Sequence, residues 1–197
     1  MEVTMKNIYD KVTSAFGAYG FNYPDGTTEV NDLGICNWLR AVVRRPWELT
    51  GVGNCFDQTL YAFWLLRNEG IAREDIKVLI CAGTVTGGGC LAHMTLIFKH
   101  EGKWHWVENT MPFPEGNGVH TFDTYPEAVE AVKQTLYKVG FANFRFGFKE
   151  DIRIEALLEK QCGYLEVVTP HLPDLRWLKY APLIQKIMRF FGLRLPQ

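Results

Sequence analysis

The sequence lacks a long apolar run, and no uncharged stretch approaches the roughly 18 residues expected of a membrane-spanning helix. Residues 1–16 carry charges at Glu2, Lys6, Asp10 and Lys11, so no apolar signal core is present there. A basic excess is also missing, because 21 lysines and arginines stand against 22 aspartates and glutamates. We therefore expect no integral membrane segment and no dedicated nucleic-acid surface.

Paired cysteine motifs are absent as well. The five cysteines form no C-x-x-C pair and their number is odd, which disfavours a disulfide framework and favours reduced thiols in the cytoplasm. The spacing of Cys81, Cys90 and His93 fits no common structural zinc pattern. The glycine-rich residues 83–89 lack a following Lys-Ser or Lys-Thr, so they make a poor phosphate cradle. We expect neither a metal nor a cofactor.

What the chain does have is material for a core: 47% of its residues are hydrophobic and 14% are aromatic. With no internal repeat, 197 residues suit a single domain, residues 1–197. Periodicity and turn residues predict helices at residues 5–16, 29–44, 55–70 and 121–139. The same signals predict strands at residues 76–81, 91–98, 104–109 and 141–148. Helices first and antiparallel strands afterwards indicate an α+β domain.

Cys55 is the first residue of the helix predicted at 55–70, with Asn54 as its N-cap. A helix N-terminus carries partial positive charge and unpaired N–H groups, which lower the pKa of a thiol and can bind an oxyanion. Cys55 is therefore a candidate nucleophile. The alternative is that Cys55 is a small buried apolar residue, as single cysteines usually are.

His93 is the candidate base. It alternates with the apolar row Met94, Leu96 and Phe98 and so faces away from it. A hairpin with an even-numbered loop, pairing Leu96 with His105, would place Glu108 directly opposite His93, where a carboxylate can hold the imidazole. A three-residue loop with a bulge at Gly102 would place Asn109 there instead.

Four motifs in order resemble the transglutaminase-like superfamily core. They are G-N-C-F-D at 53–57, L-L-R-N-E-G-I at 65–71, A-H-M-T at 92–95 and W-H-W-V-E-N-T at 104–110. That core typically reads Gly-x-Cys, a helix ending in Leu-Arg-x-x-Gly-Ile, a histidine opening a strand, and Trp-x-x-Val-Asp-Pro-Thr. The match spans about residues 51–110, and residues 111–197 would be a family-specific extension.

The resemblance implies a transglutaminase-like or papain-like core with the nucleophile helix packed on an antiparallel sheet. It implies Cys55 as nucleophile, His93 as base and Glu108 as the orienting acid, although the family position usually holds Asp. Trp38, Trp47 and Gln58 are candidate side-chain donors to an oxyanion.

The function that follows is acyl transfer through a thioester on Cys55, with hydrolysis of an amide or peptide bond preferred. A transamidase or acyltransferase on the same site is the alternative, and an acidic calcium loop is missing from the sequence. A non-catalytic protein-binding module on the same fold is the second alternative. The expected partner is a peptide or protein substrate, and the oligomeric state stays open.

Overall fold

The computed structural model describes residues 5–30, 41–85, 90–149, 154–159 and 162–163. Its larger sheet is antiparallel with the strand order β8-β7-β6-β5-β9. These strands are β5 (Ile76–Val85), β6 (Cys90–His100), β7 (Lys103–Glu108), β8 (Gly118–Phe122) and β9 (Phe141–Lys149). The smaller sheet is formed by β1 (Ala18–Asn22), β2 (Thr28–Val30), β3 (Val42–Val43), β4 (Val52–Gly53) and β10 (Cys162–Gly163).

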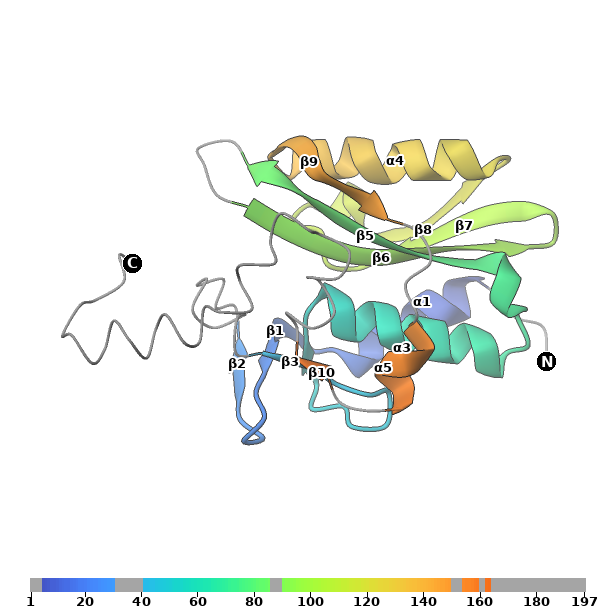
Figure 1. The fold of residues 1–197 in the computed structure, drawn as a ribbon. Helices are drawn as coiled ribbons and strands as arrows, with labels where there is room; N and C mark the ends of the chain where they lie inside the picture. The colour runs from blue at the N-terminus through green and yellow to red at the C-terminus, as the bar shows by residue number, and fades with distance from the viewer. Residues whose placement is uncertain (1–4, 31–40, 86–89, 150–153, 160–161, 164–197) are drawn as a thin grey trace.

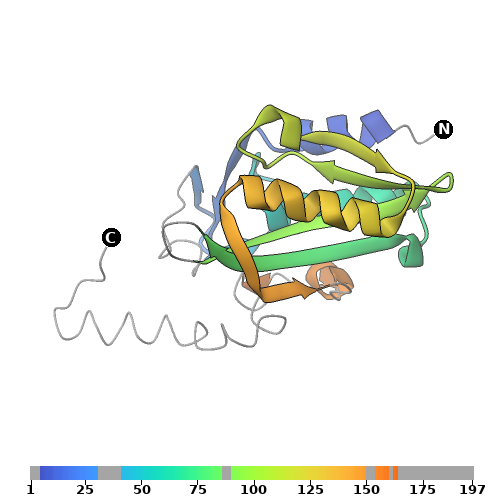
Figure 2. The ribbon, with the colours of Figure 1, turned by 90° about the horizontal axis from the view of Figure 1, so that it is seen from above.

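Helices lie on both faces of the larger sheet (Figure 1). One face is covered by α4 (Tyr125–Lys138), which runs roughly along the strands when seen from above (Figure 2). The other face is covered by α1 (Met5–Ala15) and α3 (Cys55–Asn68), with α5 (Ile154–Glu159) beside α3. The smaller sheet lies at the N-terminal end of α3 (Figure 1). This is the expected mixed α+β architecture, with the helix that begins at Cys55 packed on an antiparallel sheet.

The helix predicted at residues 29–44 is wrong at both of its ends. Thr28–Val30 is β2 and Val42–Val43 is β3, and both strands pair antiparallel with β1. β-branched valines suit a strand, and pairing with β1, which lies outside the predicted helix, decides between the two conformations. Residues 31–40 of the predicted helix lie outside the described residues.

The helix predicted from residue 121 begins later, at Tyr125. Thr124 is its N-cap: its hydroxyl accepts the N–H of Glu127, whose carboxylate accepts the N–H of Thr124 at 2.9 Å. Thr121 and Phe122 belong to β8, where Thr121 pairs with His105 of β7.

The predicted pairing of Leu96 with His105 is also wrong, by two residues. Leu96 pairs with Val107, and the turn between β6 and β7 contains only Glu101 and Gly102. Both turn residues have positive φ, 49° and 78°, as a two-residue type I′ hairpin requires. A shift of two residues keeps every side chain on its predicted face, because side chains alternate with a period of two.

The core has two parts, one on each face of the larger sheet. The first packs α1 and α3 against the even-numbered residues of β6, and the second packs α4 against Leu79, Ile97 and Trp106. Phe56, Leu60 and Leu66 of α3 are fully buried, and each stabilises the fold by about 1.5–3 kcal/mol. Because α3 is covered on most sides, the polar residues of its first turn are buried as well.

Candidate active site

The N-terminus of α3 is fixed by a buried capping network. Asn54 Oδ1 accepts the N–H of Phe56 at 2.8 Å, and Asp57 Oδ2 accepts the N–H of Asn54 at 3.0 Å. Asp57 Oδ1 accepts the N–H of Arg44 at 2.6 Å, which attaches the preceding segment to the helix. Burial raises the pKa of Asp57 to about 7, against the lowering effect of these hydrogen bonds. The network makes Cys55 the first helical residue, as the sequence predicts.

His93 and Glu108 meet on the face of the larger sheet that is turned away from α3. His93 Nε2 lies 2.8 Å from Glu108 Oε2, and both side chains are buried. The contact is diagonal across β6 and β7, since β7 pairs in the shifted register. Trp106 and Thr95 make the same diagonal contact, with Nε1 of the tryptophan donating to Oγ1 at 2.8 Å. The predicted neighbours therefore come together through a different register.

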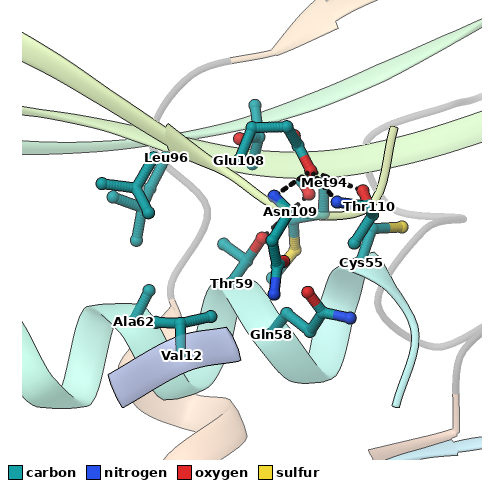
Figure 3. Close-up of a pocket in the computed structure, with 12 residues that line it drawn as sticks. Val12, Cys55, Gln58, Thr59, Ala62, Met94, Leu96, Glu108, Asn109 and Thr110 are labelled. Carbon is teal, nitrogen blue, oxygen red and sulfur yellow. Dashed lines mark hydrogen bonds between the residues drawn. The ribbon is translucent and has the colours of Figure 1, made fainter. Parts of the chain in front are cut away.

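The other carboxylate oxygen of Glu108 accepts hydrogen bonds from the residues that follow β7. Oε1 accepts the N–H groups of Asn109 at 3.1 Å and Thr110 at 2.9 Å, and also the Thr110 hydroxyl (Figure 3). Burial alone would raise the pKa of Glu108, but the charge and hydrogen bond of His93 and the bonds from Thr110 lower it. Glu108 is thus an ionised, fixed carboxylate that orients His93.

Cys55 completes the arrangement, because its thiol lies next to the His93 ring and interacts with it electrostatically. With Nε2 at Glu108, Nδ1 is the ring nitrogen left for the thiol. Burial opposes protonation of His93, but negative charge on Glu108 and Cys55 outweighs it and raises the pKa of His93 above its ordinary value. β7 ends at Glu108, and Figure 3 shows Cys55 beside Thr110, just past that end. The helix N-terminus reaches the histidine there.

A buried hydrogen bond ties α3 to β6 next to the histidine. Thr59 Oγ1, one helical turn after Cys55, donates to the carbonyl oxygen of Met94 at 2.8 Å. This bond fixes how far α3 can slide along β6, and so fixes the separation of Cys55 and His93.

Tyr19 is a site residue that sequence reasoning missed. Its buried hydroxyl lies close to the Cys55 thiol and interacts with it electrostatically. β1 runs parallel to β4 with Tyr19 paired to Gly53, two residues before Cys55. A Cβ on Gly20 would lie 2.2 Å from the carbonyl oxygen of Glu29, and one on Gly53 would lie 2.5 Å from the Phe16 ring. These glycines mark close packing around β1 and β4, but neither points to Tyr19 itself.

The three predicted oxyanion donors have different outcomes. Trp38 lies outside the described residues. Trp47 is 57% exposed, and the guanidinium of Arg45 lies 5.4 Å from its ring centroid. Gln58 is buried beside Cys55, where Nε2 donates to the Gly53 carbonyl at 3.4 Å, and no described residue partners its Oε1. Gln58 also lines a cavity of about 10 Å³, room for one water molecule, under Asn109 (Figure 3).

The other titratable residues near the sheet have structural roles. Cys81 pairs with His93 across β5 and β6, and burial, followed by the charges of Glu108 and Cys55, raises its pKa well above the ordinary value. His105 is buried against the Phe98 ring, and His120 stacks on Trp106 at 4.8 Å. Cys81 therefore stays a neutral thiol. The hydrogen bonds of His105 and His120 go to other residues than Cys55 and His93.

Within the described ranges, no helix is long and apolar enough to cross a membrane. No group of three histidine, cysteine or acidic side chains in these ranges is arranged to hold a metal ion. Comparison of the chain with protein-family models and with curated proteins finds no match.

Proposed function

We propose that the protein is a cysteine-dependent acyl-transfer enzyme that hydrolyses an amide or peptide bond. One observation carries the proposal: at the N-terminus of α3 the buried Cys55 thiol lies next to His93, whose Nε2 lies 2.8 Å from Oε2 of the buried Glu108. A nucleophile, a base bonded to it and a carboxylate that orients the base are the parts that thiol catalysis requires. These three residues are also the set implied by the transglutaminase-like motifs.

The geometry supports the following sequence of steps. The imidazolium of His93 stabilises a thiolate at Cys55, whose Sγ attacks the carbonyl carbon of the substrate while the π pair moves to oxygen. When that pair returns, the bond to nitrogen breaks and His93 gives its proton to the leaving amine. His93 then takes a proton from water, whose oxygen attacks the thioester carbon. The C–S bond breaks with its pair going to sulfur, which releases the acid and restores the thiolate beside the His93 imidazolium. Glu108 stays ionised and stabilises the imidazolium throughout.

A transglutaminase-like core, with residues 111–197 as an extension of a single domain, belongs to the same proposal. The supporting features are α3 packed on the antiparallel sheet and the order of nucleophile, base and acid along α3, β6 and β7. An amine in place of water would make the enzyme a transamidase or acyltransferase. The peptide or protein substrate and the cytoplasmic location remain predictions from the sequence.

Acetylation by p-nitrophenyl acetate tests the proposal without knowledge of the substrate. We expect a thioester on Cys55, found by peptide mapping and removed by hydroxylamine, and steady release of p-nitrophenolate. Cys55→Ala and His93→Ala should each abolish this turnover, and the double variant should be hardly slower than either, because the two groups act as a unit.

His120→Ala is the matched control, since His120 stacks on Trp106 and hydrogen-bonds the Gly116 carbonyl, not Cys55 or His93. It should keep wild-type turnover. Acetylation of other thiols with Cys55 unmodified would contradict the enzyme proposal and favour the non-catalytic binding module.

A further inference from the structure

We propose that the hydroxyl of Tyr19 is the side-chain donor of the oxyanion hole at Cys55. The inference rests on the proposed acyl transfer and adds a catalytic residue that the family motifs do not contain. The second donor is the backbone N–H of Cys55 itself, which at the first position of α3 has no partner within the helix.

The position of Tyr19 follows from the backbone of the smaller sheet. β1 and β4 are parallel neighbours, and Tyr19 is paired with Gly53, so its side chain leaves the sheet beside the first turn of α3. Gly20 has no room for a Cβ against β2 and the Val52 side chain, and Gly53 has none against Phe16 and Asp57, so both strands are closely packed at this point. The ring packs edge-on against Phe21, with centroids 6.3 Å apart, so the ring is held in place.

The hydroxyl lies close to the atom on which the reaction occurs. After burial, the Cys55 thiol is the largest influence on the Tyr19 hydroxyl, which places the hydroxyl near Sγ. After attack, the oxyanion is two covalent bonds away from Sγ, so a donor that reaches the sulfur can also reach that oxygen. A fixed donor at this point stabilises charge that develops only in the transition state, which is the condition for catalysis by an oxyanion hole.

The hydroxyl also keeps its proton. Burial, followed by negative charge on Cys55, Asp57 and Glu108, raises the pKa of Tyr19 above its ordinary value. A tyrosine in this setting donates a hydrogen bond and does not compete with His93 as a base. Its role is therefore separable from that of His93 by experiment.

Two reagents separate an oxyanion donor from a group that acts only on the thiol. p-Nitrophenyl acetate reacts through a tetrahedral oxyanion, whereas iodoacetamide is attacked at a saturated carbon and loses iodide without one. In Tyr19→Phe we expect acetylation of Cys55 to slow by about a hundredfold, as for loss of one oxyanion donor. The alkylation rate of Cys55 should change by less than about threefold, well below the effect of losing an oxyanion donor.

Tyr61→Phe is the matched control. Tyr61 lies on α3, as Cys55 does, but its ring stacks on Trp64. It should leave both rates unchanged. Asn54→Ser, which keeps a capping oxygen, and Gln58→Leu test the neighbouring amides. An equal fall of both rates in Tyr19→Phe, or a selective fall of acetylation in Asn54→Ser or Gln58→Leu with Tyr19→Phe normal, would overturn the assignment. Wild-type protein that is alkylated but never acetylated at Cys55 would instead overturn the proposed function.

Discussion

At the scale of single residues, the decisive contact is that between His93 and Glu108. The sequence offered two residues to orient the imidazole, Glu108 and Asn109, and the choice depended on the hairpin loop. Glu108 accepts or shares hydrogen bonds at both oxygens, while the side chain of Asn109 points toward Gln58 on α3 (Figure 3). The contact is diagonal across the strands, a span that the long side chain of a glutamate covers.

Replacing Glu108 by glutamine should slow acetylation of Cys55 by at least about a hundredfold, the lower end for general acid–base catalysis. The change keeps the size of the side chain and removes the charge that favours imidazolium. Since that charge raises the pKa of His93, the His93 titration should move to lower pH in the variant, and nuclear magnetic resonance of the imidazole would follow it.

Asn109→Ala is the comparison variant, and it should slow acetylation much less. A severe defect in Asn109→Ala together with near-normal Glu108→Gln would show that the amide orients the histidine. The Cys55–His93 pair would then stand without Glu108.

At the scale of elements, the site depends on how closely β1, β4 and α3 approach. Gly53 lies where a Cβ would meet the Phe16 ring at 2.5 Å and the Asp57 Cβ at 3.0 Å. Its backbone is not in the left-handed region, so space, and not conformational freedom, requires the glycine.

Gly53→Ala should lower the free energy of unfolding by about 1–3 kcal/mol through overpacking. Phe16 or the first turn of α3 must shift, so alkylation of Cys55 by iodoacetamide should also slow. Urea unfolding and the alkylation rate measure the two effects.

Gly17→Ala provides the control in the same segment. A Cβ there meets only the Gly51 carbonyl oxygen at 3.8 Å, an ordinary contact. The change should stay within about 0.5 kcal/mol, as for surface substitutions. Equal effects at Gly17 and Gly53 would show that close packing at β4 does not set the position of α3.

At the scale of the whole molecule, the larger sheet separates two cores. α3 and the thiol lie on one side, and α4 packs on the other through Ala128, Val132 and Leu136. Stability is drawn from both sides, while Cys55 itself belongs to the core on the α3 side.

Leu136→Ala should therefore lower the free energy of unfolding by about 2–5 kcal/mol, the usual cost of such a core truncation. The alkylation rate of Cys55 in the folded protein should stay near that of the wild type. Gln134→Ala, an exposed change on the same helix, should alter neither quantity. A large loss of Cys55 reactivity in Leu136→Ala would show that α4 supports the site across the sheet.

The sequence alone determined the elements whose signals are local. The N-cap Asn54, the apolar spacing of α3 and the alternation of β6 are each encoded within a few residues, so the position of Cys55 at the start of α3 and the face of His93 could be predicted. Even the wrong hairpin register left Glu108 on the correct face, because a shift of two residues preserves alternation.

Tertiary structure decided what depends on distant partners. β3 is a strand because it pairs with β1 and β10, and no pattern within residues 29–44 contains that information. Tyr19 comes close to Cys55 because β1 pairs in parallel with β4, which directly precedes the nucleophile. A side chain that contacts the nucleophile from another strand has no periodicity or spacing of its own, so only the folded chain reveals it.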